Sequence, residues 1–337
     1  MRRGTGGSRD DADNKCERKT RTTVGKGMID VADVEITARD GVRLSGFAAG
    51  GGVGPALVLC NSLLGGVDGW TELIEDFAPY HHLVGWQYRG MRGRDAQAAT
   101  IEQHTEDLLD VLDHHKIDKC VLVGWSMGSR VAFEAMNVAP DRFIGGVIVC
   151  GVLGRPLQRL AEPFAGPLAA IAPRLGDLAA ELAPYAPSVW QLAGMGARSG
   201  TVHDILRLIG AVSESVARPR LGELLAETTS LSLEQLLGLL RAIDHHVVHK
   251  PLQVATVPTL IIGGSADPLC PRGDVMRAAE GLGTAETMIV PSAGHLLPVE
   301  FAELLHLRIA KFLRVHTGFD RLAGTEPPAL TLLPARI

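Results

Sequence analysis

The sequence has few aromatic residues, few cysteines and no long apolar run. Phe, Trp and Tyr make up 4% of its 337 residues, and there are five cysteines. No apolar run approaches the roughly 18 residues of a membrane-spanning helix, so we expect no membrane span. The odd number of cysteines, with no Cys-x-x-Cys pair, argues against a disulfide framework and a zinc site. These features predict buried thiols in a reducing, cytoplasmic environment.

Charge is also nearly balanced, and this argues against nucleic acid as a partner. The formal net charge is −5, and the basic residues are scattered instead of forming a stripe with interleaved aromatics. Residues 1–27 are rich in Lys and Arg but contain no apolar core of a signal peptide, so they are predicted to be a disordered leader. Residues 318–337 show no periodicity and are predicted to be a flexible tail.

Short apolar runs predict strands, and the stretches between them predict helices. Asp33–Thr37 and Val42–Ala48 flank a turn at Arg39–Gly41, a pattern typical of a β-hairpin. Buried parallel strands are expected where almost no polar residue occurs, at 56–60, 83–86, 119–123, 146–150, 259–262 and 287–290. Helices are expected over 70–77, 101–115, 127–138 and 299–315. This alternation predicts an α/β fold with a mostly parallel, eight-stranded sheet and helices on both faces.

The alternation breaks between residues 151 and 250, where Leu, Ala and Pro dominate and no strand pattern occurs. We predict an inserted helical unit there, which divides the sheet-forming core into residues 28–150 and 251–317. Its clearest helix begins at Ser232, which forms a capping-box pattern with Gln235 ahead of an apolar stripe. Prolines divide the first half of the insert into short segments.

Ser126 is the candidate nucleophile. It is the centre of Gly124-Trp125-Ser126-Met127-Gly128, which follows a predicted strand and opens a predicted helix. Glycines two residues on either side permit a sharp turn, because a Cβ there would collide with the strand or the helix start. The full Gly-x-Ser-x-Gly pattern occurs once in the chain. The alternative is a Gly-rich turn with an incidental serine.

A serine hydroxyl becomes a useful nucleophile only beside a base that a third group orients. Parallel strands end at the same edge of a sheet, so the partners of Ser126 should also follow strands. His295 follows the strand ending at Val290, and Asp267 follows the run ending at Gly264. Each has a structural alternative, a loop histidine with satisfied nitrogens or a turn aspartate bonded to its own backbone.

The order Ser126, Asp267, His295 resembles that of the α/β-hydrolase superfamily, of the AB hydrolase-1 type with a helical cap after the sixth strand. The resemblance covers about residues 31–315. It implies that Ser126 attacks an acyl carbon, that His295 moves the proton, and that Asp267 holds the imidazole. It also implies that the insert is the cap.

The resemblance places an oxyanion loop at Cys60–Gly66. Many relatives carry His-Gly there, whereas this chain has Asn61-Ser62, as in relatives resembling enol-lactone hydrolases. The implied oxyanion donors are the N–H groups of Met127 and Leu63. Trp125, Leu64 and Asn61 lie near the nucleophile and are predicted to line a substrate pocket. Apolar residues around the serine predict a small or medium apolar acyl substrate.

No cofactor or metal is predicted. His245 and His249 have the spacing that places two imidazoles on one helical face, but no Glu lies between them as in metallopeptidases. Arg89 is followed by Gly90 and is predicted to stabilise a tight loop instead of binding substrate.

Several functions share the predicted triad. Hydrolysis of a carboxylic ester through an acyl-serine is the leading prediction. Lactone hydrolysis, cofactor-free perhydrolysis and cleavage of a carbon–carbon bond next to a carbonyl stay open as alternatives. A non-catalytic ligand-binding protein with the same fold is the alternative of another class.

Overall fold

A central β-sheet organises the molecule, which we describe from a computed structural model. The described residues are 18–20, 23–24, 27–63, 66–91, 99–151, 204, 206–207, 212–213, 215–246, 256–282 and 285–320. The strands are β1 (Arg18–Thr20), β2 (Thr23–Val24), β3 (Gly27–Met28), β4 (Val31–Thr37), β5 (Arg43–Gly50), β6 (Ala56–Cys60), β7 (His82–Trp86), β8 (Cys120–Trp125), β9 (Phe143–Val149), β10 (Thr259–Gly264) and β11 (Glu286–Val290).

The helices alternate with these strands. They are η1 (Asp68–Trp70), α1 (Thr71–Phe77), α2 (Ile101–His114), α3 (Met127–Val138), η2 (Pro140–Arg142), α9 (Arg218–Ser230), α10 (Leu233–His245), α11 (Arg272–Leu282), α12 (Leu297–Glu300) and α13 (Ala302–Thr317). Among the described helices, none has both the length and the apolar character needed to cross a lipid bilayer.

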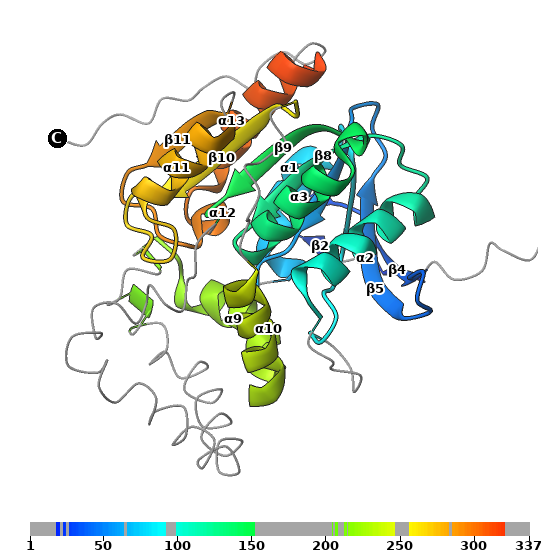
Figure 1. The fold of residues 1–337 in the computed structure, drawn as a ribbon, viewed down its shortest axis with the longest axis horizontal. Coiled ribbons are helices and arrows are strands. Elements are labelled where there is room, and N and C mark those ends of the chain that lie inside the picture. Colours follow the sequence, from blue (N-terminus) through cyan, green and yellow to red (C-terminus); the bar gives the residue numbers. More distant parts are fainter. Residues whose placement is uncertain are drawn as a thin grey trace, which may run out of the picture.

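The main sheet has nine strands in the order β1-β4-β5-β7-β6-β8-β9-β10-β11 (Figure 1). Strands β7, β6, β8, β9, β10 and β11, adjacent in this order, pair in parallel. Strands β1, β4 and β5 add an antiparallel edge. Eight of the strands follow the prediction, including the hairpin with its turn at Gly41, where φ is 84°. The ninth strand, β1, lies within residues 1–27 and pairs with β4 through its backbone, and the prediction of a leader at residues 1–27 stays a prediction.

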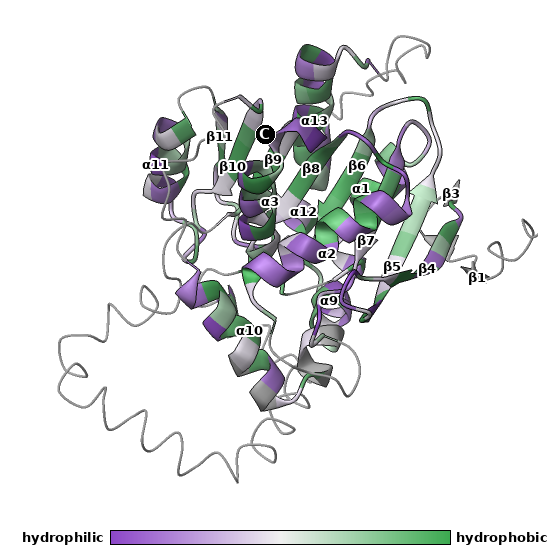
Figure 2. Cartoon of the chain, turned by 45° about the vertical axis from the view of Figure 1, so that its right-hand side comes forward, coloured by the Kyte–Doolittle hydropathy of each residue, from purple (hydrophilic) through white to green (hydrophobic). Residues whose placement is uncertain are grey.

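Two apolar layers cover the sheet, one on each face. Helices α2, α3 and α11 bury their apolar sides on one face, and α1 and α13 do so on the other. Strands β6 and β8, in the middle of the sheet, are green along most of their length in Figure 2, because apolar helices cover both faces there. The nearly unbroken apolar runs of the sequence therefore correspond to strands between two layers.

Helices α9 and α10 belong to the predicted insert and lie beyond one end of the sheet in both views (Figures 1 and 2). The capping box at Ser232 and Gln235 is present as predicted, with the Ser232 side chain accepting from the Gln235 N–H. Leu221 and Leu224 of α9 and Leu239 of α10 are buried against the core. The proline-rich first half of the insert lies outside the described residues, and the division into domains stays a prediction.

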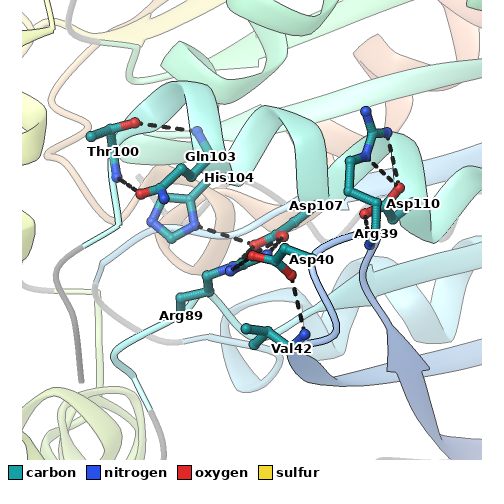
Figure 3. A network of polar contacts seen from close by, with 9 residues as sticks. All are labelled: Arg39, Asp40, Val42, Arg89, Thr100, Gln103, His104, Asp107 and Asp110. Carbon is teal, nitrogen blue, oxygen red and sulfur yellow. Dashed lines mark hydrogen bonds and ion pairs between the residues drawn. The ribbon is translucent and has the colours of Figure 1, made fainter. Parts of the chain in front are cut away.

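Ion pairs tie the β4–β5 turn to helix α2 (Figure 3). The guanidinium of Arg89 binds Asp107 through Nε, at 3.0 and 2.8 Å from the two carboxylate oxygens, and also binds Asp40. Arg39 binds Asp110 through its backbone N–H at 2.7 Å and through Nε at 2.9 Å. Arg89 is thus occupied by two carboxylates of the fold, which agrees with its predicted structural role.

Candidate active site

Ser126 occupies the sharp turn between β8 and α3. Its backbone has φ 54° and ψ −115°, a conformation that residues with a side chain rarely adopt. The turn requires Gly128, because a Cβ there would lie 1.9 Å from the carbonyl oxygen of Cys60. The Ser126 N–H donates to the Val149 carbonyl at 3.0 Å, which fixes the turn to the neighbouring strand. This partly exposed serine is therefore held at the carboxyl edge of the sheet.

The side chains of Ser126, His295 and Asp267 form a continuous chain of hydrogen bonds. His295 Nε2 lies 2.8 Å from Ser126 Oγ, and His295 Nδ1 lies 2.8 Å from Asp267 Oδ2. Because a carboxylate only accepts, we assign the imidazole proton to Nδ1, which leaves Nε2 to accept from the serine hydroxyl. His295 and Asp267 are 2% and 3% exposed, so water competes little for these contacts.

The second oxygen of Asp267 is held by the backbone. Oδ1 accepts from the N–H groups of Leu269 and Cys270 at 2.8 and 3.0 Å. Burial by itself would raise the pKa of Asp267, but the His295 imidazole and these two amides outweigh it and keep the pKa below its ordinary value. The carboxylate is therefore charged at neutral pH, and it can orient the imidazole and stabilise its protonated form.

The loops after β10 and β11 approach closely, and this brings acid and base together. The N–H of Ala266 donates to the carbonyl of Ala293 at 3.0 Å. A Cβ at Gly264 would lie 2.2 Å from that same carbonyl oxygen, so a larger residue would force the loops apart. Asp267 and His295 follow these contact points directly, which explains how residues of two loops meet.

The predicted oxyanion donors lie beside the serine turn. Met127 is the first residue of α3, where backbone N–H groups have no acceptor within the helix. The contact of Gly128 with Cys60 places this helix start against the end of β6, where the loop leading to Leu63 begins. Two N–H groups and a helix N-terminus could therefore face a developing oxyanion. The assignment of Met127 and Leu63 as donors stays a prediction.

A line of aromatic and amide contacts supports the site. Asn61 donates to the Trp86 carbonyl at 2.7 Å and accepts from Trp70 Nε1 at 2.9 Å. The ring of Trp70 packs edge-to-face on Trp125 at 5.8 Å, and Trp125 Nε1 donates to the His295 carbonyl at 3.0 Å. These contacts give Asn61 and Trp125 a supporting role, and their predicted contact with substrate stays a prediction. Leu64, the third predicted pocket residue, lies outside the described residues.

Cys150 is a neighbour of the triad that the sequence analysis treated only as a buried hydrophobe. It follows β9, with φ 48°, and its sulfur lies within 4.8 Å of ligand atoms of both Asp267 and His295. Burial, together with the Asp267 carboxylate, raises the pKa of this thiol well above its ordinary value, so it stays protonated. In the described part of the chain this is the one cluster with three potential metal ligands. Its donors could hold a soft metal ion only after the thiol loses its proton.

Two residues of the site region were missed by the sequence analysis. Cys150 carried a usable signal, because it follows a parallel strand at the same edge as the triad. Thr228, whose hydroxyl donates to the Leu63 carbonyl at 2.8 Å, carried none, because the sequence of the insert does not reveal where α9 packs. Among the described residues, Cys60, Cys120 and Cys270 are also buried and form no disulfide, and the burial of Cys60 and Cys120 follows the prediction.

Comparisons with known proteins agree with this geometry. A family model described as alpha/beta hydrolase fold matches residues 55–302. The 3-oxoadipate enol-lactonase 1 of Acinetobacter baylyi is 24% identical over 303 residues, which cover 87% of this chain and 98% of the relative. The dihydrolipoyllysine-residue acetyltransferase component of the acetoin cleaving system of Pseudomonas putida is 25% identical over 285 residues, covering 82% and 68%. An esterase from Exiguobacterium antarcticum has a similar structure, with a TM-score of 0.65, 16% identity and coverage of 83% and 99%.

The matched segment includes most of the chain and all three members of the hydrogen-bonded triad. The chain therefore belongs to the alpha/beta hydrolase fold family, and the predicted fold class is confirmed. It is a hydrolase with relatives among esterases and enol-lactonases at low sequence identity.

Proposed function

We propose that this chain is a serine hydrolase that cleaves a carboxylic ester or a related acyl bond through an acyl-Ser126 intermediate. The observation that carries the proposal is the hydrogen-bonded chain from Ser126 through His295 to Asp267, with 2.8 Å at each link. A binding protein has no physical need for this arrangement on a strained turn, whereas acyl transfer requires each part of it.

In the first half of the reaction, Ser126 Oγ attacks the carbonyl carbon while His295 Nε2 takes the hydroxyl proton. The carbonyl oxygen becomes negatively charged and is stabilised by the N–H groups of Met127 and Leu63. His295 then gives its proton to the leaving alcohol oxygen as the carbon–oxygen bond breaks. Asp267 keeps the imidazolium oriented and compensates its charge throughout.

In the second half, His295 takes a proton from water, and the resulting hydroxide attacks the acyl carbon of the intermediate. The tetrahedral species collapses, the bond to Ser126 Oγ breaks, and the proton returns from His295 to that oxygen. The products are a carboxylic acid and the alcohol released in the first half.

Apolar surroundings support a small or medium apolar substrate. Leu63 and Met127 belong to the same buried cluster as Leu231, which follows α9, and Leu239 and Ile243 of α10. Side chains of this kind favour an apolar acyl or leaving group over a highly charged one.

Lactone hydrolysis is the second candidate, and the enol-lactonase relative favours it because it aligns over 98% of its own length. A lactone is a cyclic ester, so attack on its carbonyl by Ser126 needs no additional group. The leaving oxygen then remains on the acyl chain. Perhydrolysis and carbon–carbon bond cleavage would use the same triad with a different acceptor or leaving group.

A fluorophosphonate probe tests the serine mechanism. We expect wild type to be labelled and Ser126→Ala to be unlabelled, with Ser45→Ala, which alters an exposed serine on β5, labelled like wild type. Equal labelling of Ser126→Ala would overturn the proposal. Turnover of p-nitrophenyl esters of increasing acyl length, beside a series of lactones, then separates the two candidates. Background rates with every substrate and no labelling would favour a ligand-binding protein.

A further inference from the structure

Helix α9 contacts the loop that carries the predicted oxyanion donor Leu63. Thr228 Oγ1 donates to the Leu63 carbonyl at 2.8 Å, although the two residues are 165 positions apart in sequence. Thr228 and Leu63 are 5% and 7% exposed. A buried carbonyl without a hydrogen-bond donor is unfavourable. The backbone at Leu63 is therefore stabilised in the conformation in which the Thr228 hydroxyl reaches its carbonyl.

A second contact fixes the other end of the same helix to the same loop. Arg220 of α9 binds both carboxylate oxygens of Glu72, at 3.1 and 2.9 Å, and also donates to the Asp68 carbonyl at 2.8 Å. Asp68 begins η1, where the loop ends. Because the Arg220 guanidinium makes two parallel hydrogen bonds to the Glu72 carboxylate, it fixes the orientation of α9 relative to α1 as well as their separation.

Apolar packing completes the attachment. Leu221, Leu224 and Leu225 of α9 are buried in the same cluster as Trp70 and Trp125. Three described residues of this region are thus held in place: Asn61 by its hydrogen bonds, the Leu63 carbonyl by Thr228, and the Asp68 carbonyl by Arg220. Of these three points, the Thr228 contact is the one at the predicted oxyanion donor.

We propose that Thr228 is a positioning residue for the oxyanion hole, whose hydroxyl holds the Leu63 backbone so that its N–H faces the oxygen that becomes charged. The inference rests on the proposed function. The hydroxyl does not touch the substrate and acts through the Leu63 carbonyl. Because oxyanion contacts strengthen as charge develops, a misplaced donor lowers kcat more than it weakens substrate binding.

Thr228→Val tests the proposal, because it keeps the shape of the side chain and removes the donor. We expect kcat for a p-nitrophenyl ester to fall about tenfold, less than the 10²–10³ for complete loss of a donor, with KM within about twofold. The affinity for an alkyl boronic acid, which forms a tetrahedral adduct with the serine, should fall by the same factor as kcat. Thr228→Ser should restore both values.

Thr259→Val is the matched control. Its hydroxyl also donates to a backbone carbonyl, that of Val257 at 2.9 Å, and it is also buried, but it lies at the opposite end of β10 from the site. We expect it to keep the wild-type kcat. If Thr228→Val folds poorly by circular dichroism, Thr228→Cys retains size with a weaker donor and should give an intermediate kcat.

Wild-type kcat in Thr228→Val, an equal loss in Thr259→Val, or no rescue by Thr228→Ser would each overturn the inference. Failure of the proposed function gives a different result, because either wild type would then be unlabelled and inactive or Ser126→Ala would keep its labelling and turnover. If labelling depends on Ser126 while Thr228→Val is fully active, the serine mechanism stands and the positioning role is lost.

Discussion

His295 links two residues that come from different loops, and its replacement removes both links at once. His295→Ala leaves Ser126 without a base, so we expect kcat for ester hydrolysis to fall by at least about 10³-fold. The measurement is steady-state turnover with circular dichroism on the same samples. His316→Gln is the control, because His316 pairs with Glu286 at the far end of α13. Unchanged turnover in His295→Ala would remove this residue from the site.

Gly128 is the residue on which the serine turn depends. In Gly128→Ala the new methyl group would meet the Cys60 carbonyl at 1.9 Å, so backbone must shift. We expect the free energy of unfolding to fall by about 1–3 kcal/mol, as for overpacked interior sites, with loss of fluorophosphonate labelling. Urea unfolding measures the first effect. If Gly128→Ala were as stable as wild type and fully labelled, α3 and the end of β6 could separate without loss, and the requirement for glycine would be wrong.

At the scale of elements, α9 offers a substitution with the opposite sign. A Cβ at Gly222 would have nothing within 4 Å, and the residue is in the interior of the helix. Gly222→Ala should raise the free energy of unfolding by about 0.5–1 kcal/mol, because alanine loses less conformational freedom in a helix. Urea unfolding of Gly222→Ala and Gly128→Ala side by side gives the comparison. A lower stability for Gly222→Ala would contradict the open surroundings of this position.

Elements with a strong local pattern were predicted well. Helix α3 begins at Met127 and ends at Val138 as expected, and β6 has its predicted bounds, Ala56–Cys60. Apolar runs are informative here because strands covered on both faces admit few polar residues. Strand β1 was missed, because its polar sequence, Arg18–Thr20, gives no strand signal and its order comes from pairing with β4.

The candidate site was predictable where strand ends determine position. Ser126, Asp267 and His295 each follow a parallel strand, so topology alone places them at one edge. Contacts between the insert and the core were not predictable, since Thr228 reaches Leu63 through the packing of a helix whose docking has no sequence signal. The close approach of the loops after β10 and β11 was predictable only in part. The sequence shows Gly264, but it does not show that Ala293 packs against it.

At the scale of the whole molecule, buried histidines determine the response to acid. His104 of α2 is fully buried, and neither of its ring nitrogens has a hydrogen-bond partner among the described residues. Burial and the nearby Arg89 lower the pKa of His104 to about 3, so the ring is neutral although it lies 4.0 Å from Asp107 (Figure 3). Burial, with His114 and His82 nearby, lowers the pKa of His115 to about 4.

A lowered histidine pKa means that the unfolded chain binds protons that the folded chain does not. Stability should therefore fall as pH decreases from about 6.5, the unfolded value, toward the folded values, by about 1.4 kcal/mol per pH unit for each fully linked histidine. His104→Phe should reduce this slope between pH 6.5 and 4.5, whereas His245→Gln, which alters an exposed histidine of α10, should leave it unchanged. Urea unfolding at several pH values across this range measures the slope of the unfolding free energy against pH. Equal slopes in wild type and His104→Phe would contradict the neutral, buried ring.

The triad is assembled from the ends of β8, β10 and β11, so Ser126 and His295 meet across 169 positions of the chain. Contacts so distant in sequence form late and slowly during folding, because long loops must close first. Hydrolytic activity is thus a direct reporter of completed folding. After dilution from denaturant, turnover should return only with the slowest phase, while secondary structure returns earlier.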